Sequence, residues 1–563
     1  MSTIESRRFA LLVASGVILF LSYQAWKKDF PDAPPPAATQ AAAPATPVAP
    51  AEGDKLPSPP AALAAPTAAT ALPERVASEP KSQRVSVETD RYRVELSTLG
   101  GDIRRVELKG YPLAKALPDK NVDLLDDQPN RWFVVQSGLV TPTGPIASHT
   151  DSYTTAATSY RLADGADHID VPLELQTSDG LRVRKVYRFS RGSYVIGLQH
   201  KLVNAGTTAV SASPYVQLWR TAFAVGEEPP FMKTFTGLGL YEKKTSGSYR
   251  FRKVAYDDLA DEPVDLKQTG GWLAMLQHYF VVAVIPPADE AASFAGKPST
   301  TRGFVGQYIG ASQEIPVASE KNFDTRLYIG PKLQQSLAAI APGLELTVDY
   351  GILTPLAEPL FWLLDWFHKL TKNWGLAIIL LTFAVKLAMF KLSEAQYRGM
   401  AKMKKYAPRI QELKERYGDD RERMQKAMME MYKKEKFNPL AGCWPILVQF
   451  PVFIALYWVL LESVELRQAD FFLWLNDLSA PDPYFVLPVL FGISMWAQQK
   501  LSGQVMTDPM QQRVMSIMPV MLTAFFAFFP VGLVLYWLVS NLIGIAQQWY
   551  ITRKLEKEGL SHR

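Results

Sequence analysis

Between about Arg84 and Tyr350 the chain alternates apolar and polar residues in short runs separated by Gly, Asp, Asn and Pro. A period of two places successive side chains on opposite faces of a β-strand, and turn residues between such runs are typical of antiparallel sheets. The clearest runs lie at residues 91–96, 131–136, 181–189, 194–203, 278–285, 325–330 and 346–351. We therefore predict an all-β sandwich or barrel over residues 84–352. Its exposed residues could form a platform for a ligand or partner, or an ordinary solvated sheet face.

Before this region, residues 9–26 form an uncharged run that follows Arg7 and Arg8. No small-residue cleavage site follows the run, so we predict an uncleaved N-terminal membrane anchor over residues 1–28. Residues 29–83 are dominated by Ala and Pro. Such a composition cannot bury a core, which predicts a disordered linker.

After the β region, five apolar segments are each long enough to cross a bilayer. We predict these membrane-spanning helices at residues 373–391, 437–461, 483–500, 514–530 and 532–552. The last two come from a single uncharged run of 39 residues, 514–552. A continuous helix of that length would reach about 58 Å, roughly twice the hydrocarbon thickness, so we expect Pro530 and Gly532 to divide it. Residues 356–370 mix Trp and Phe with charged residues, which predicts an amphipathic helix lying on the outer membrane surface.

The charges of the connections indicate the orientation. Residues 391–436 hold 14 Lys and Arg against 8 Asp and Glu, whereas 464–482 hold one Arg against four acids. By the positive-inside rule the connection 392–436, the loop 501–513 and the tail 553–563 are predicted to be cytoplasmic. The loop 462–482 and the β region then lie outside. With six spans in total, the N-terminus is also predicted to lie inside.

One charged residue, Lys386, falls within a predicted span. A charge at that depth costs about 2.5–3.5 kcal/mol on insertion scales and usually faces protein or water. Thr382 precedes it by four residues and shares its helix face. Lys386 could extend to the inner headgroups, or it could line a wet polar cavity open to the inner side. Two further spans add polar groups at depth, and these are Gln449 in one and Tyr536, Ser540, Gly544, Gln547 and Gln548 in the other.

The basic connection is predicted to be a helical hairpin with a break at residues 418–420, where Gly is followed by two Asp. Methionines recur along it at Met400, Met403, Met424, Met428 and Met431. Methionine-rich surfaces adapt to varied apolar partners, although ordinary helix packing explains the same residues.

Composition and motifs exclude several function classes. The chain has one cysteine, Cys443, so an internal disulfide is impossible. It holds no phosphate-binding loop, no metal-ligand spacing among its six histidines and no arrangement typical of a catalytic nucleophile. We therefore predict no cofactor, no metal and no enzymatic reaction. The net charge of +5 is too small to favour a dedicated nucleic-acid binder.

From residue 358 to 555 the chain closely resembles the YidC family of bacterial membrane protein insertases. Four motifs that carry the resemblance are NWGLAIILLTF (373–383), EAQYRGMAKMKK (394–405), FNPLAGCWPILVQFPVFIALY (437–457) and DPMQQRVMSIMPV (508–520). The resemblance implies a multi-domain protein of the bacterial inner membrane, with a five-helix core around a hydrophilic groove. That groove would be open to the cytoplasm and to lipid. The anchor, linker and β region resemble the Gram-negative form, whose periplasmic domain is a β-supersandwich.

The resemblance also implies roles for individual residues. Lys386 occupies the position of a basic groove residue that is typically arginine in the family, and Thr382 matches a groove-lining position. Trp537 falls where some relatives have tyrosine, beside Tyr536. With Gln449 and Ser540 these are our predicted groove residues. The five hairpin methionines, Arg553 and Lys554 are the predicted contacts to clients or to the ribosome.

The partners implied are nascent inner-membrane proteins, the Sec translocon with its accessory subunits, the ribosome, the signal-recognition pathway and the phospholipid bilayer. Our hypothesis is an insertase and chaperone that needs no energy source of its own. Two alternatives stay open at this point. One is a channel or solute transporter built on the same polar spans, and the other is a tethered periplasmic carbohydrate enzyme or binding module.

Overall fold

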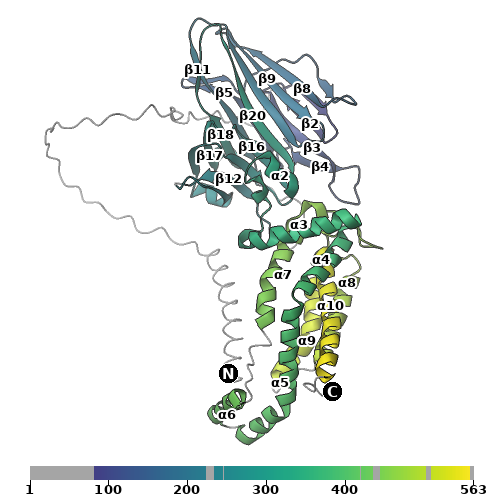
Figure 1. Cartoon of the computed structure of the whole chain (residues 1–563). Helices are drawn as coiled ribbons and strands as arrows, with labels where there is room; N and C mark the ends of the chain where they lie inside the picture. The colour runs from purple at the N-terminus through teal and green to yellow at the C-terminus, as the bar shows by residue number, and fades with distance from the viewer. Residues whose placement is uncertain are drawn as a thin grey trace, which may run out of the picture.

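A computed structural model of the chain describes residues 82–222, 234–244, 246–418, 420–434, 444–502 and 509–557. Figure 1 shows a β domain standing on one end of a helical domain. The predicted N-terminal anchor and nearly all of the predicted linker lie outside the described residues.

The β domain consists of two sheets of 12 and 8 strands. The strands of the larger sheet are β1 (Arg84–Glu88), β2 (Tyr92–Ser97), β3 (Asp102–Pro112), β4 (Asn121–Leu125), β5 (Phe133–Thr141), β6 (Gly144–Ala147), β7 (Ser159–Arg161), β11 (Val210–Arg220), β14 (Val264–Thr269), β17 (Ala291–Pro298), β18 (Phe304–Gly310) and β19 (Gln313–Ile315). The smaller sheet holds β8 (His168–Gln176), β9 (Leu181–Ser190), β10 (Val195–Asn204), β12 (Gly237–Lys243), β13 (Tyr249–Ala255), β15 (Trp272–Leu276), β16 (Phe280–Ile285) and β20 (Glu320–Pro331). A short 3₁₀ helix, η1 (Asp257–Ala260), follows β13.

The principal path of the larger sheet runs β14-β17-β18-β11-β5-β3-β2-β1-β7, and that of the smaller runs β13-β12-β15-β16-β20-β10-β9-β8. Among the described strands only β1 and β7 pair in parallel. The core lies between the sheets and includes Phe133, Phe189, Phe294 and Tyr328. The prediction of an all-β domain is therefore confirmed.

The alternation that predicted strands corresponds to real burial. Along β9 and β10 every second residue is buried. The run 346–351, by contrast, was wrongly predicted to be a strand, because it contains the 3₁₀ helix η2 (Leu344–Thr347) and the start of a second, η3 (Gly351–Leu353). Gly343 explains the difference. It has φ +77°, and a Cβ there would meet the Tyr241 ring at 2.1 Å, so the chain turns tightly against the sheet.

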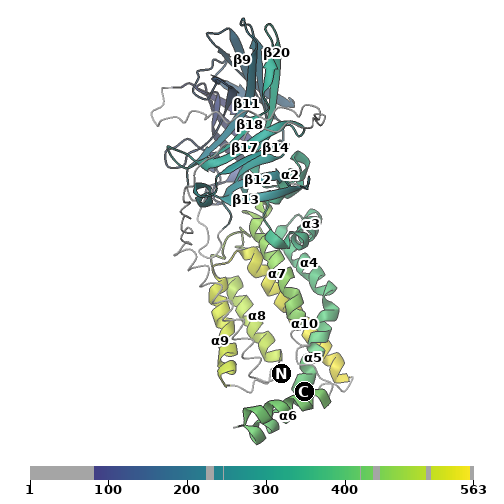
Figure 2. The same ribbon diagram turned by 90° about the vertical axis from the view of Figure 1, so that its left-hand side faces the viewer.

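The helices are α2 (Gln334–Ile340), α3 (Thr354–Thr371), α4 (Trp374–Ala388), α5 (Phe390–Tyr417), α6 (Arg421–Lys434), α7 (Trp444–Glu462), η5 (Val464–Leu466), α8 (Val486–Ser502), α9 (Pro509–Phe526) and α10 (Val531–Lys557). Helix α3 lies across the end of the helical domain beneath the sheets, and α6 lies at the opposite end (Figures 1 and 2). Asp420 accepts a hydrogen bond from the Arg423 N–H (3.1 Å) and so caps α6, as expected of the hairpin break.

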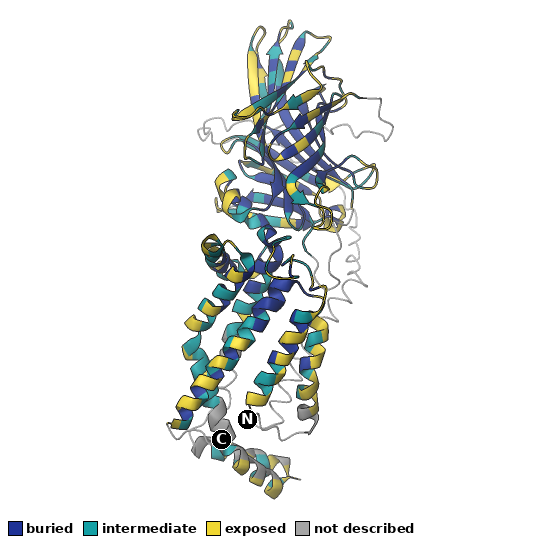
Figure 3. Ribbon diagram, turned by 90° about the vertical axis from the view of Figure 1, so that its right-hand side faces the viewer, coloured by how far each residue is buried: buried dark blue, intermediate teal, exposed yellow. Residues whose placement is uncertain are grey.

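Within the described residues α10 is long and apolar enough to cross a membrane, and α4 with residues 390–399 passes the same test as a pair bent by 62°. Two shorter apolar helical stretches span Gln449–Glu462 and Arg513–Phe526. The count of six spans, one of them in undescribed residues, therefore stays a prediction. Figure 3 shows buried residues concentrated in the β domain and in the helix ends next to it.

The two domains meet through hydrogen bonds to backbone atoms. His278, in the turn after β15, contacts the carbonyl of Leu461 at the end of α7 (2.9 Å). Arg467, just after η5, donates to the carbonyls of Pro112 (2.7 Å) and Leu113 (3.0 Å) at the end of β3. The connection between α7 and α8 therefore forms a large part of the contact between the helical domain and the β domain.

Glu465 in η5 is a titratable group buried at this contact. Its Oε2 is buried and has no hydrogen-bond partner in the described part of the chain. The pKa of Glu465 is raised to about 7, chiefly by burial. Hydrogen bonds from backbone N–H groups, including that of Gln334, lower the pKa, and the negative charge of Asp365 raises it. Between about pH 4.5 and pH 7 the Glu465 carboxyl is therefore protonated in the folded protein but ionised in the unfolded chain, where its pKa is the ordinary 4.5.

We predict that Glu465→Gln stabilises the protein by an amount that grows as pH rises above about 4.5 and levels off above about 7. A raised carboxyl pKa lowers the free energy of unfolding as pH rises from about 4.5 through about 7, because ionisation then opposes burial. The apparent melting temperature of the variant in detergent should exceed that of the wild type by a few degrees at about pH 8.5, and the two should converge below about pH 4.5, where the wild-type carboxyl is protonated in both the folded and the unfolded chain. The exposed Glu314→Gln is the control and should show no such pH-dependent gain. An equal shift for both variants would contradict the prediction.

Candidate functional site

The candidate site begins on α4, which carries Lys386. The Asn373 side chain caps this helix by accepting a hydrogen bond from the Leu376 N–H (3.0 Å). Thr382 is fully buried, and its hydroxyl donates to the Ile378 carbonyl (2.7 Å). Lys386, one turn later, is half-buried. Among the described residues no carboxylate lies within ion-pair distance of its ammonium group, and the Glu394 carboxylate of α5 pairs with Arg398 and Lys554 instead.

The helix ends two residues after Lys386 and turns by 62° into α5. Gln547 of α10 donates from Nε2 to the Lys386 carbonyl (3.2 Å), which satisfies an acceptor that a helix end leaves open. The sequence predicted a span that ends at Lys391, but α4 ends at Ala388 and Lys391 belongs to α5. The bend has no Pro or Gly beside it in the sequence.

Polar contacts gather around the half of α10 remote from the β domain. Tyr397 of α5 donates to the Gly544 carbonyl (3.2 Å), and Asn541 donates to Ser494 of α8 (3.3 Å). A Cβ on Gly544 would come within 3.1 Å of Gln498 Nε2, so the small residue allows this close approach. Together with Lys386 and Gln547, these residues bring polar groups of α4, α5, α8 and α10 into one region, which we call the polar end.

Aromatic rings occupy the other half of α10. Trp537 packs against Phe453 of α7 (ring centroids 4.6 Å apart), Phe526 of α9 (4.5 Å) and Phe491 of α8 (5.7 Å). Tyr536 stacks on Phe453 at 6.3 Å. We call these five residues the aromatic cluster. The turn after α9 closes over it, because the Val531 and Gly532 N–H groups donate to the carbonyls of Ala480 (2.8 Å) and Leu478 (2.9 Å).

The structure thus separates the predicted groove residues. Tyr536 and Trp537 belong to the aromatic cluster, while Lys386 belongs to the polar end. Gln449 on α7 and Ser540 on α10 are half-buried, each within about one turn of a residue of the aromatic cluster. The stripe predicted on α10 is a buried face, since Tyr536, Gly544 and Gln548 are all buried.

The predicted cytoplasmic contacts are partly described. Met424 and Met431 on α6 are half-buried, whereas the side chains of Met400, Met403 and Met428 lie outside the described residues. Lys554 bonds to Glu394 of α5 (3.1 Å), which lowers the pKa of that carboxyl chiefly through this hydrogen bond. The Arg553 guanidinium lies 3.9 Å from the Trp549 ring centroid. The start of the basic tail is therefore held against α5 and α10.

Sequence reasoning missed four residues of the polar end: Tyr397, Ser494, Gln498 and Asn541. Ser494 and Gln498 are four residues apart in an apolar helix, the same spacing that drew attention to α10. Tyr397 and Asn541 become recognisable only once α5 and α8 are packed against α10.

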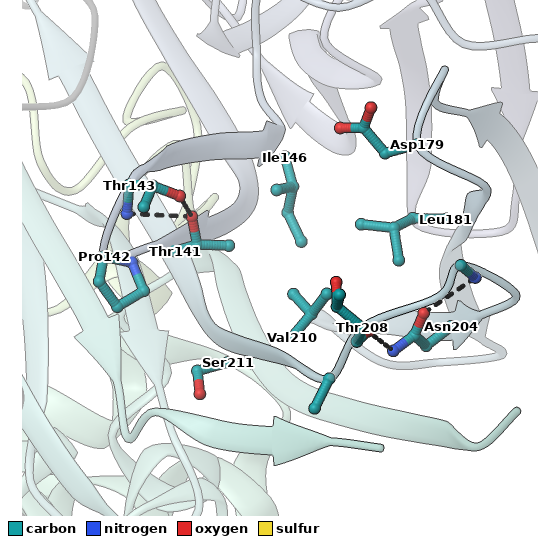
Figure 4. Close-up of a pocket in the computed structure, with 12 residues that line it drawn as sticks. Thr141, Pro142, Thr143, Ile146, Asp179, Leu181, Asn204, Thr208, Val210 and Ser211 are labelled. Carbon is teal, nitrogen blue, oxygen red and sulfur yellow. Dashed lines mark hydrogen bonds between the residues drawn. The ribbon is translucent and has the colours of Figure 1, made fainter. Parts of the chain in front are cut away.

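A separate pocket of about 460 Å³ lies in the β domain, at the sheet ends farthest from the helices (Figure 4). It is lined by the turns after β5, β8 and β10, and its described lining includes a single carboxylate, Asp179. Glycoside chemistry ordinarily uses two carboxylates that flank the bond, so the pocket gives no support to the carbohydrate-enzyme alternative. The described residues also include no group of three or more His, Cys, Asp or Glu placed to hold a metal.

Two family models match the chain. The YidC periplasmic domain matches residues 84–363, and the 60Kd inner membrane protein family matches residues 366–558. The matched ranges meet just before the end of α3, close to the boundary between the β domain and the helices that follow.

The chain is also similar to curated relatives and to a solved structure. A membrane protein insertase YidC from Methylococcus capsulatus is 48% identical over 84% of this chain and 86% of its own length. One from Thioalkalivibrio sulfidiphilus is 44% identical over 99% of each chain. A crystal structure of an active YidC insertase covers 84% of this chain and 93% of its own, with 18% identity and a TM-score of 0.37. On the identity and coverage of the curated relatives, the chain belongs to the YidC family of membrane protein insertases.

Proposed function

We propose that this protein inserts nascent proteins into the inner membrane and assists their folding there, through a hydrophilic groove open to the cytoplasm and to lipid. The observation that carries the proposal is the division of α10 into a polar end and an aromatic cluster. A polar recess that reaches only partway across the bilayer needs such a division: hydrated groups on the inner side and a dry closure on the outer side.

In this proposal the groove receives the polar segment of a client that must cross the membrane. Hydrated groups in the inner leaflet shorten the apolar path of that segment, which lowers the cost of transfer. The Lys386 ammonium attracts acidic client segments. Lysine supplies charge without the planar fork of an arginine, so the attraction needs no bidentate geometry.

Apolar client helices would leave along faces of the protein that already contact lipid. Helix α9 offers such a face, with Ile517, Val520 and Met521 exposed about two to three turns from its start at Pro509. No bond is made or broken in this scheme, and we propose that the protein is not an enzyme.

The orientation and remaining partners follow from charge and family membership. We propose that both termini, the α5–α6 hairpin and the basic tail are cytoplasmic and that six helices span the membrane. The five hairpin methionines, Arg553 and Lys554 would then meet clients or the ribosome, and the Sec translocon and the signal-recognition pathway would deliver or share clients. The contacts of Lys554 to Glu394 and of Arg553 to Trp549 limit how far the first turn of the tail can reach.

We predict that Lys386→Ala lowers insertion of clients with acidic translocated segments about fivefold, the effect of losing roughly 1 kcal/mol of attraction between opposite charges in a wet site. Lys386→Arg should insert the same clients at the wild-type level, because the positive charge is kept. The measurement is protease protection of translated clients in proteoliposomes. A client whose translocated segment is neutral serves as the control and should respond equally to all three proteins. Unchanged insertion of several acidic clients by the Ala variant would refute the role of Lys386.

We predict that the wild-type protein in proteoliposomes passes no ions, and that Phe453→Ala combined with Trp537→Ala causes an ion leak. Removing both rings opens the closure between the polar end and the outer side. Phe528→Ala, which removes an exposed ring outside the cluster, is the matched control and should remain tight. A wild-type protein that conducts ions without a client would instead favour the channel alternative.

A further inference from the structure

The loop between β3 and β4 presents apolar side chains to the outside. Leu113 and Leu117 are 50% and 42% exposed, and Ala114, Ala116 and Pro118 are also exposed. The loop has a defined shape, because the Leu113 N–H donates to the Lys120 carbonyl (2.6 Å) and the Leu117 N–H donates to the Ala114 carbonyl (2.9 Å). Its exposed leucines are therefore held in place rather than folded back onto the sheet.

Lys115, between the two leucines, fixes this loop to the connection between α7 and α8. Its ammonium donates to the Asp470 carboxylate and to the carbonyls of Asn476 (2.6 Å) and Gln468 (3.4 Å). Gln468 in turn donates from Nε2 to the Pro112 carbonyl (3.0 Å). The loop of the β domain and the connection of the helical domain thus form one joined protrusion.

That connection carries two exposed apolar residues of its own, Phe472 (66%) and Leu473 (68%). Leu473 has φ +55°, a conformation that a leucine rarely adopts, so the turn holds this side chain outward at a cost. Neither residue is needed to fill the core. Four exposed apolar side chains from two domains are therefore held in segments that Lys115 joins.

Phe471, the residue before Phe472, fixes the position of this protrusion relative to the helices. Asn373, which caps α4, donates to the Phe471 carbonyl (3.2 Å). The absence of a side chain at Gly375 leaves room for the Phe471 ring, since a Cβ there would lie 2.0 Å from it. Phe472 and Leu473 therefore follow directly on a residue that contacts the first turn of α4.

We propose that Leu113 and Leu117, together with Phe472 and Leu473, enter the headgroup region of the outer phospholipid leaflet and anchor the β domain to the membrane surface. The inference rests on the proposed placement of α4 and α10 across the membrane. Apolar groups held at the end of a membrane-crossing helix face the headgroup boundary, where apolar surface is buried to a depth of about 5–10 Å. The anchor restrains the β domain at a point separate from its covalent connection through α3.

Fluorescence quenching by lipids tests this anchor in the full-length protein. With Cys443→Ser as background, bimane is attached to Leu117→Cys, to Phe472→Cys and to Val317→Cys. Val317 is the matched control, because it is similarly exposed (47%) but lies between β19 and β20, at the sheet ends far from the helices. The proteins are reconstituted in vesicles of phosphatidylethanolamine and phosphatidylglycerol, with or without lipids that carry a shallow nitroxide.

We expect the nitroxide to quench the probes at 117 and 472 roughly twofold and to leave the probe at 317 unchanged, as shallow insertion requires. A probe at 117 that behaves like that at 317 would overturn the inference. A blue shift at 117 without quenching would also overturn it, since protein would then cover the loop. If that shift grew with protein density, the cover would be a second copy.

A fourth probe separates this inference from the proposed function. Leu542 is exposed on α10, and bimane at Leu542→Cys should be quenched by a lipid nitroxide placed deep in the acyl chains. Quenching at 542 without quenching at 117 would overturn the anchor alone. Absence of quenching at 542 would show that α10 does not cross the bilayer, and the proposed function would fail with it.

Discussion

The helical domain depends on one constraint: a polar or charged group inside a bilayer must find partners or water. Some polar side chains described there find hydrogen-bond partners within the protein. The Thr382 hydroxyl donates to the backbone of its own helix, α4, and the Asn541 amide of α10 donates to Ser494 of α8. The Lys386 ammonium differs, because no acid of the described chain pairs with it. Under the proposed function, water from the inner side would be the partner of this charge at the last turn of α4.

This constraint explains why α10 is built as two unlike halves. If polar contacts continued along its whole length, water could follow them across the membrane. The rings of Phe453, Phe491 and Trp537 replace those contacts in the outer half, and ring packing leaves little room for water. The hydrogen bonds from Val531 and Gly532 to the α7–α8 connection then close the outer end. Under the proposed function, hydration on one side and dry packing on the other would distinguish this protein from a pore.

The sequence was most informative where one face of an element is solvated. In β9 and β10 the alternation of residues matches their burial, because one face of each strand meets the core and the other meets water. β5 is buried on both faces, so its burial does not alternate, although the run 131–136 that overlaps it was among those that predicted strands. The segment 346–351 alternates without being a strand, because the contact of Gly343 with Tyr241 fixes a turn that local residue preferences do not reveal.

The candidate site shows the same limit. Lys386 was identifiable from a single charge in an apolar run, and the α10 stripe from its helical spacing. The sequence alone could not assign Tyr536 and Trp537 to the aromatic cluster, because that assignment depends on which face of α10 meets α7, α8 and α9. Likewise the Lys386 carbonyl, just before the bend after Ala388, accepts a hydrogen bond from Gln547, which lies 161 residues away. Such contacts arise from packing between helices, which spacing within one helix does not determine.

The contacts between the β domain and the α7–α8 connection suggest why two such different domains keep a fixed arrangement. Arg467, Gln468 and Lys115 direct most of their hydrogen bonds to backbone carbonyls across the boundary. Bonds of this kind depend on the path of the chain more than on the identity of the partner side chain, so the surface of the β domain can change while its placement is retained. The same connection packs Phe471 against α4 and receives hydrogen bonds from the start of α10. Any force that tilts the β domain is therefore transmitted first to the ends of α4 and α10 next to it, and these are two of the four helices that contribute to the polar end.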